Sequence, residues 1–144
     1  MRACSIIRTA LVGIATITIL TIQTGCEHAL PTPPPPSQAT LSIIQTSIFS
    51  PSCAFSGCHI PNSLGPMPMR NATESFNSLV NVNSIQRPTL KRVQPGNAAN
   101  SYIIQKLDGA SGIFGARMPL GVPLLSTDEI NLIRQWIDEG ALNN

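Results

Sequence analysis

The chain has 144 residues, of which 11% are charged and 4% are aromatic. This length suffices for one domain with attached segments but not for two ordinary domains. Removal of a predicted signal over residues 1–25 leaves seven basic against seven acidic residues, and so neutral a chain lacks the positive surplus that binding to nucleic acid requires.

The N-terminus is typical of an export signal. Arg2 and Arg8 give it a positive start, and residues 6–22 are apolar apart from Arg8 and small polar side chains. The apolar stretch after Arg8 falls short of the about 20 residues that a membrane-spanning helix needs. The signal ends at Gly25-Cys26, which resembles a lipobox, so Cys26 is predicted to carry a lipid that attaches the mature protein to a membrane.

Two alternatives to lipid attachment stay open. Gln23 stands where a lipobox usually has leucine, so ordinary cleavage or an uncleaved anchor also fits.

Glu27 follows Cys26 in place of the aspartate that commonly retains lipoproteins in the inner membrane, which favours the outer membrane. The predicted location is therefore the periplasmic side or the surface of the bacterial envelope.

Residues 26–38 are predicted to be a linker. The proline-rich run at 31–36 favours an extended polyproline helix, which is a stiff spacer. The folded domain is then expected over residues 39–144.

Helices account for the regular structure expected in the domain. Thr40 can cap a helix over residues 41–49, which should end at Ser50 because the residue before a proline is disfavoured in helical geometry. A loop with three prolines follows at 61–71. The next predicted helix covers residues 73–80.

Two further helices are predicted in the second half. Asn97 can cap a helix over residues 98–107, where Tyr102, Ile103, Lys106 and Leu107 share one face. Ser126 and Glu129 form a capping box at the start of the last helix, and its apolar stripe consists of Ile130, Ile133, Trp136 and Ile137. No strand-like run competes, so the predicted fold class is all-α.

The segment Cys53-Ala54-Phe55-Ser56-Gly57-Cys58-His59 carries the most specific chemistry. Two thiols followed at once by an imidazole form the attachment pattern of covalent haem, in which the sulfurs bond to the porphyrin and the histidine ligates the iron. The usual spacing has two residues between the cysteines, and here there are four. Cys4 is lost with the signal and Cys26 would be acylated, so Cys53 and Cys58 are the thiols left in an oxidising compartment.

Other fates of these side chains stay open. A local disulfide between Cys53 and Cys58 is compatible with their spacing and with export, although it has no need of His59. Another metal is the third alternative, but a zinc site takes four ligands and a blue copper site takes two histidines. The domain offers fewer donors than either.

Met118 is the predicted second axial ligand of a haem iron. It lies in the proline-stiffened segment Arg117-Met118-Pro119, 59 residues after His59, far enough for the chain to reach the opposite face of a cofactor. Met67 and Met69 are rival ligands, and a plain packing role is the common alternative for any methionine. Basic residues that could pair with haem propionates or an acidic partner, or be solvated, are Arg87, Lys91, Arg92 and Arg117.

Taken together, these motifs resemble small c-type cytochromes, and more narrowly the planctomycete-type cytochrome c domains and their lipoprotein relatives. The matching motifs are Ser47-Ile48-Phe49, Gly57-Cys58-His59, Val93-Gln94-Pro95-Gly96-Asn97, Ser101-Tyr102, Lys106-Leu107, Arg117-Met118-Pro119 and Ile133-Arg134-Gln135-Trp136-Ile137-Asp138-Glu139-Gly140-Ala141. They cover nearly the whole domain. The resemblance implies an all-helical cytochrome c-like fold with short helices and long loops around one haem, whose first and last helices cross.

The same resemblance implies a function. It carries haem attachment over to Cys53 and Cys58, and axial ligation of the iron to His59 and Met118. We expect an electron carrier with one haem c, not an enzyme, which exchanges electrons with a redox partner protein. The alternatives are a haem-free, disulfide-linked interaction domain of the envelope, and a haem enzyme or gas sensor with five-coordinate iron.

Overall fold

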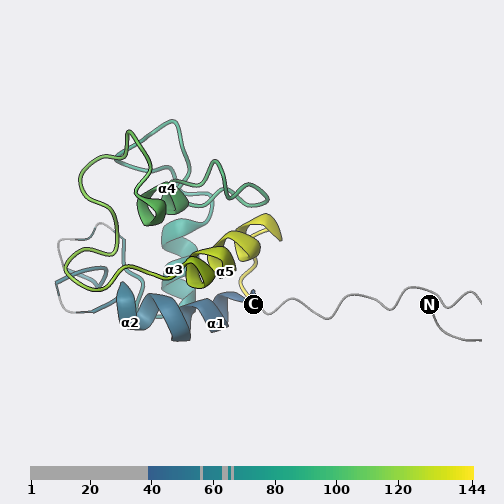
Figure 1. The fold of residues 1–144 in the computed structure, drawn as a ribbon. Coiled ribbons are helices and arrows are strands. Elements are labelled where there is room, and N and C mark those ends of the chain that lie inside the picture. Colours follow the sequence, from purple (N-terminus) through teal and green to yellow (C-terminus); the bar gives the residue numbers. More distant parts are fainter. Residues whose placement is uncertain (1–38, 56, 63–64, 66) are drawn as a thin grey trace, which may run out of the picture. The chain divides into compact units, whose positions relative to one another are not determined.

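A computed structural model describes residues 39–55, 57–62, 65 and 67–144. The predicted signal, Cys26 and the linker lie outside these residues. The described part is a small, mostly helical domain (Figure 1). Isolated bridges such as Val80 with Val93 occur, but the described residues contain no sheet. The all-α prediction is confirmed at this level.

The first helix runs through three segments without a break. These are α1 (Leu41–Ile44), the π-helical η1 (Gln45–Phe49) and α2 (Ser50–Ser52). The Thr40 side chain caps it as predicted, accepting a hydrogen bond from the Ile43 amide at 3.3 Å. The predicted end at Ser50 is wrong, because the helix passes through Pro51 to Ser52.

The π-helical turn gives a physical reason for this difference. In a regular α-helix a proline ring clashes with the carbonyl four residues earlier. In η1 the Ser50 amide donates to the Gln45 carbonyl, five residues back. Such a turn is wider than an α-helical one, so the clash is relieved just before Pro51.

The two middle helices start at different kinds of cap. α3 (Ala72–Leu79) begins at Asn71, whose side chain accepts from the Glu74 amide at 2.9 Å. It therefore lies one residue before the predicted range. α4 (Tyr102–Asp108) starts four residues later than predicted, because the Asn97 side chain caps a separate turn by accepting from the Asn100 amide.

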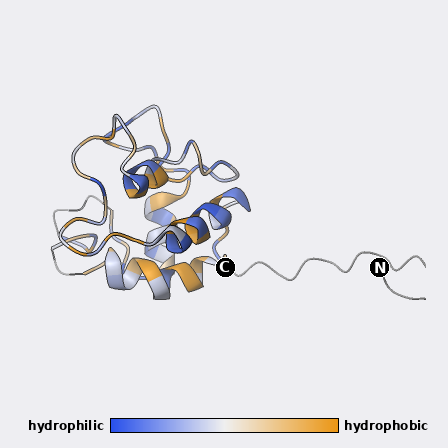
Figure 2. Cartoon of the chain, viewed as in Figure 1, coloured by the Kyte–Doolittle hydropathy of each residue, from blue (hydrophilic) through white to orange (hydrophobic). Residues whose placement is uncertain are grey.

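The last helix, α5 (Thr127–Asp138), contacts both α1 and α4. Its predicted capping box is present, with the Ser126 hydroxyl and the Glu129 carboxylate each accepting from the other's amide. Ile130, Ile133, Trp136 and Ile137 are all buried, while much of the visible side of α5 is hydrophilic (Figure 2). These buried side chains join residues of α1 and α4 in one hydrophobic core.

The N-terminal turn of α1 is held by the other end of the chain. The Leu41 amide donates to Asn144 Oδ1 at 3.0 Å and the Ser42 amide donates to the Asn144 carbonyl at 2.9 Å. These bonds satisfy two of the donors that a helix start leaves without an intrahelical partner. The first and last described segments are therefore joined at this point.

A substitution at Trp136 can test how much this packing contributes to stability. Its side chain is 1% exposed, and its indole N–H donates to the Leu142 carbonyl at 2.8 Å. Trp136→Ala should lower the free energy of unfolding by about 3–5 kcal/mol, the usual cost of removing a large buried side chain. Urea unfolding measures this loss. Leu142→Ala, at an exposed side chain, is the control and should change stability by less than about 0.5 kcal/mol.

Candidate functional site

One cavity of about 470 Å³ lies beside the segment that follows α2. Cys53, Cys58, His59 and Met118, which are the predicted cofactor ligands within the domain, all line it. The predicted lipid-attachment site, Cys26, lies outside the described residues. Aromatic and aliphatic side chains form most of the rest of the wall, including Phe49, Phe55, Leu79, Ile85, Tyr102, Ile103, Leu107 and Leu120.

The thiol segment is closed on itself by backbone hydrogen bonds. The His59 amide donates to the Cys53 carbonyl at 3.1 Å, and the Cys58 amide donates to the Phe55 carbonyl at 3.0 Å. Gly57 has a φ of 85°, a left-handed conformation that favours glycine. These bonds bring the two ends of the segment together, with one thiol at its start and the other next to the imidazole.

The two thiols are close enough to influence each other. Burial raises the pKa of the Cys53 thiol to about 12, and the neighbouring Cys58 adds to this shift. Cys53 is therefore a neutral thiol at pH 7. No disulfide joins Cys53 to Cys58, the two cysteines among the described residues.

The His59 imidazole packs against the loop that follows it. Its Nδ1 atom is buried and has no hydrogen-bond partner of normal geometry among the described residues. Burial lowers the pKa of His59, the nearby Met67 backbone opposes this effect, and the charge of Arg92 adds to it. The imidazole is therefore favoured in its neutral form, which is the form that ligates metals.

Gly65 makes this packing possible. A Cβ atom added at residue 65 would lie 2.5 Å from His59 Nδ1 and 2.7 Å from the Cys58 carbonyl oxygen. Both distances are shorter than real contacts, so only glycine allows the loop to lie this close to the imidazole. The Gly65 amide also donates to the Cys58 carbonyl at 3.2 Å.

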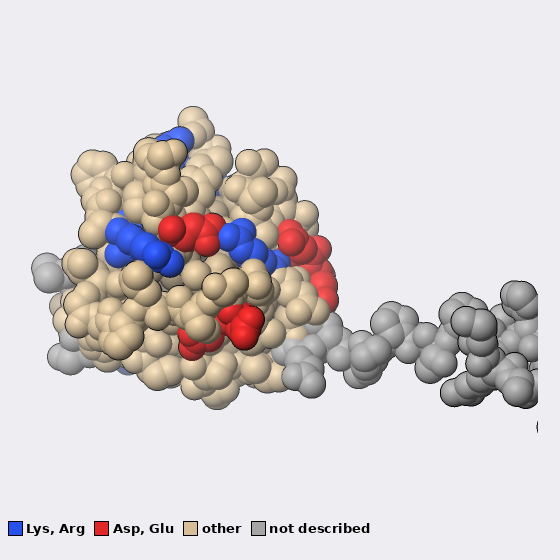
Figure 3. Space-filling model, in the orientation of Figure 1, with Lys and Arg blue, Asp and Glu red and all other residues tan. Residues whose placement is uncertain are grey.

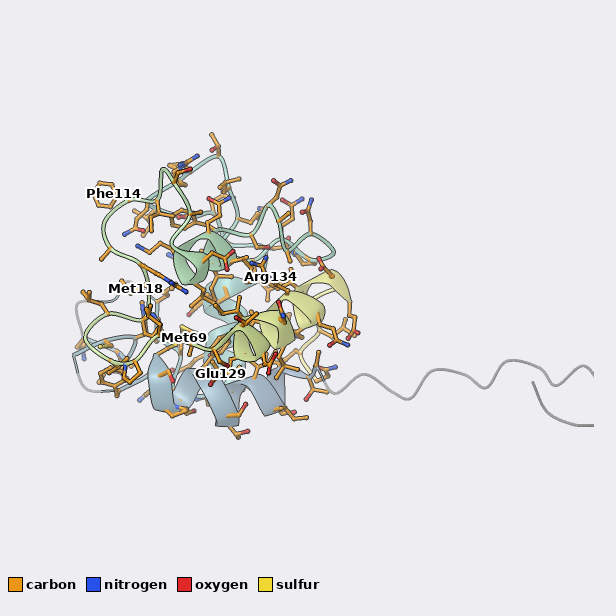
Figure 4. All side chains as sticks on the ribbon, viewed as in Figure 1. Met69, Phe114, Met118, Glu129 and Arg134 are labelled. Carbon is orange, nitrogen blue, oxygen red and sulfur yellow. The ribbon has the colours of Figure 1, made fainter. Side chains whose placement is uncertain are left out.

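Three methionines from two segments line the cavity. Met67 and Met69 belong to the loop before α3, and Met118 belongs to the connection between α4 and α5 (Figure 4). Met69 is 2% exposed and is part of the core. The structure thus brings the predicted ligand Met118 and both of its rivals to one cavity.

A buried polar network fixes the loop of Met69. The Met69 amide donates to the His59 carbonyl at 2.9 Å, and the Met69 carbonyl accepts from Gln45 Nε2 at 2.8 Å. Gln45 Oε1 in turn accepts from the Ser75 hydroxyl at 2.6 Å. The π-helical segment, α3 and the backbone of His59 are therefore linked through one glutamine.

Arg92 and Lys106 are the basic residues that line the cavity. The sequence predicts a possible charge-pairing role for Arg92. For Lys106 and Tyr102 it predicts only that they share one helix face. Tyr102 and Lys106 are four residues apart and share a helix face with Ile103 and Leu107, and this spacing is the sequence feature that could have indicated their place at the cavity. The other basic candidates do not line the cavity, and each donates to a backbone carbonyl: Arg87 to Gly112, Lys91 to Asn81, and Arg117 to Leu107.

No aspartate or glutamate is among the described residues that line this cavity. Ion pairs among the described residues join Arg70 to Glu74 and Arg134 to Asp108. Most of the face seen in Figure 3 is uncharged.

The described residues contain no cluster of three or more histidine, cysteine, aspartate or glutamate side chains suited to a metal ion, which gives the zinc alternative no support. None of their helices has the length and apolarity needed to cross a membrane.

Gly65→Ala tests the close packing of the imidazole. The new methyl group should displace His59, shift the NMR signals of its imidazole, and cost about 1–3 kcal/mol of unfolding free energy through overpacking. Gly57→Ala is the matched control, because a Cβ at residue 57 meets nothing within 4 Å. That variant should lose only about 1–2 kcal/mol through its left-handed backbone. Unchanged His59 signals in Gly65→Ala would contradict the packing described here.

Comparison with protein-family models, with curated proteins and with solved structures finds no match for this chain. The resemblance to c-type cytochromes therefore stays a prediction. What the described residues do establish is a mostly helical domain whose two thiols, one imidazole and three thioethers line a single apolar cavity.

Proposed function

We propose that this domain binds one haem c covalently and serves as an electron carrier. The observation that carries the proposal is the meeting of Cys53, Cys58, His59 and Met118 on one cavity, although Met118 is 59 residues from the other three. The volume of about 470 Å³ lies within the range of about 300–1,000 Å³ that is usual for cofactor sites.

The donor set suits this cofactor. Cys53 and Cys58 would bond to the porphyrin through thioethers, and the segment that carries them is closed by the His59 amide. His59 would ligate the iron in its neutral form. Its Nδ1 is buried against Gly65, which leaves Nε2 as the nitrogen for the metal. Arg92 supplies positive charge at the cavity wall, where a haem carboxylate would need a partner.

The bound cofactor would supply an iron that exchanges one electron between its ferrous and ferric states. His59 and Met118 would fill both axial positions, so no coordination site remains for a substrate. A thioether ligand and a mostly apolar surround favour the ferrous form and raise the potential. These features support a carrier over an enzyme or gas sensor.

The contact between α1 and α5 supports a cytochrome c-like arrangement, in which the terminal helices cross. We propose further that Cys26 attaches the protein by lipid to the bacterial envelope, facing the periplasm or the outside. The linker at residues 26–38 would then hold the domain off the membrane, where it can meet a redox partner protein. This part of the proposal rests on the sequence.

Haem attachment can be tested on the full chain produced in bacteria with a haem c maturation system. The purified protein should stain for haem on a denaturing gel, and its intact mass should contain one haem, because thioether bonds survive denaturation. Cys53→Ser combined with Cys58→Ser should abolish the stain, and Ser52→Ala should keep it. A colourless wild-type protein with its two sulfurs linked would instead identify a disulfide-bonded interaction domain.

The identity of the second axial ligand can be tested by three matched variants. Met118→Leu removes the thioether with little change in volume, so the methionine-to-iron charge-transfer band should disappear and the ferrous protein should bind carbon monoxide. Met67→Leu and Met69→Leu should keep the band and stay closed to carbon monoxide. Loss of the band in either of these, with retention in Met118→Leu, would assign the ligand to the loop before α3.

A further inference from the structure

Lys106 is a buried cation without an acidic partner. Its side chain is 8% exposed, and its ammonium donates to the Phe114 carbonyl at 2.8 Å and to the Ala116 carbonyl at 2.6 Å. Neither ion pair of the described residues includes it. A buried ammonium is costly unless it is well hydrogen-bonded, so these two carbonyls account for its position.

The main chain of the same residue binds the next part of the loop. The Met118 amide donates to the Lys106 carbonyl at 2.9 Å. Tyr102, one turn earlier on α4, accepts from the Phe114 amide at its hydroxyl at 3.0 Å. Arg117 also donates to the Leu107 carbonyl on α4 at 2.6 Å. Helix α4 therefore holds residues 114–118 through five hydrogen bonds, of which Lys106 makes three.

Residues 114–116 have little apolar packing that could fix them. Phe114 is 67% exposed and points outward (Figure 4), and Gly115 and Ala116 are also exposed. The apolar side chain of this segment is therefore not what anchors it. Hydrogen bonds from a charged donor are stronger than neutral ones, so the Lys106 ammonium is the main side-chain contact of residues 114–116.

We propose that Lys106 is the positioning residue for Met118. By holding the carbonyls of Phe114 and Ala116, it keeps the Met118 thioether at the cavity and so keeps the second axial position closed to external ligands. This inference rests on the proposed function. Lys106 would act through the loop and would not itself be a ligand of the iron.

Lys106→Met tests the inference, because it removes the ammonium and keeps a long apolar side chain. The loss of two charge-assisted hydrogen bonds should weaken the methionine-to-iron band and raise the affinity of the ferric protein for imidazole by about tenfold or more. Lys106→Arg should restore most of the band. Lys91→Met is the matched control, since the Lys91 ammonium also binds a carbonyl, that of Asn81, but lies outside the cavity wall; it should behave like wild type.

Hydrogen exchange provides a readout that does not depend on the spectrum. The Met118 amide should exchange about tenfold faster or more in Lys106→Met than in wild type, and at the wild-type rate in Lys91→Met. Should Lys106→Met fail to fold, Tyr102→Phe removes the separate bond to the Phe114 amide and should raise imidazole affinity in the same direction by a smaller factor.

Two results would overturn the inference. The first is a Lys106→Met protein with an unchanged band, imidazole affinity and Met118 exchange rate. The second is an unchanged band together with a shifted reduction potential, which would make Lys106 a counter-charge for a haem carboxylate. The proposed function fails separately, through a wild-type protein that contains no haem.

Discussion

A backbone hydrogen bond of 3.1 Å between the His59 amide and the Cys53 carbonyl closes the segment that carries both thiols. The rest of the site is arranged around this closure. The His59 carbonyl accepts from the Met69 amide, and the Met69 carbonyl accepts from Gln45 inside the first helix. The imidazole is thus fixed through its own backbone from two directions. Because the ends of the segment meet, the wider spacing of the cysteines does not carry Cys58 and His59 away from Cys53.

The opposite part of the cavity is organised differently. There, α4 contributes apolar side chains together with Tyr102 and Lys106, and its polar groups bind the backbone of a loop with little buried surface. One side of the cavity therefore depends on close packing at Gly65, and the other depends on hydrogen bonds from a charged side chain. Since the two sides come from distant parts of the chain, the core contact of α5 with α1 and α4 is what keeps them facing one cavity.

Features of the fold that depend on neighbouring residues could be predicted from the sequence. The Thr40 cap, the capping box of Ser126 and Glu129, and the buried stripe around Trp136 were all predicted and are present. The passage of the first helix through Pro51 was not, because the local rule for proline takes no account of a preceding π-helical turn. The late start of α4 was missed because Asn97 is an equally good cap for a turn.

The candidate site could also be predicted only in part. The motif that ends in Cys58-His59 could be recognised from its residue types, and Met118 from its distance along the chain. The role of Lys106 was not recognisable, because lysine on a helix is usually solvated and its carbonyl partners become neighbours only when the loop folds back. Gly65 was counted merely as part of a loop, since its close approach to His59 Nδ1 is a tertiary contact.

The bonds between α1 and Asn144 have a mechanical consequence. A pulling force applied through the segment before Ala39 would first load the amides of Leu41 and Ser42, which are tied to Asn144. None of these three residues borders the cavity. The first helix reaches the cavity wall only at Phe49 and Ser52, so a load on Ala39 would meet the bonds to Asn144 before it met the residues of the cavity.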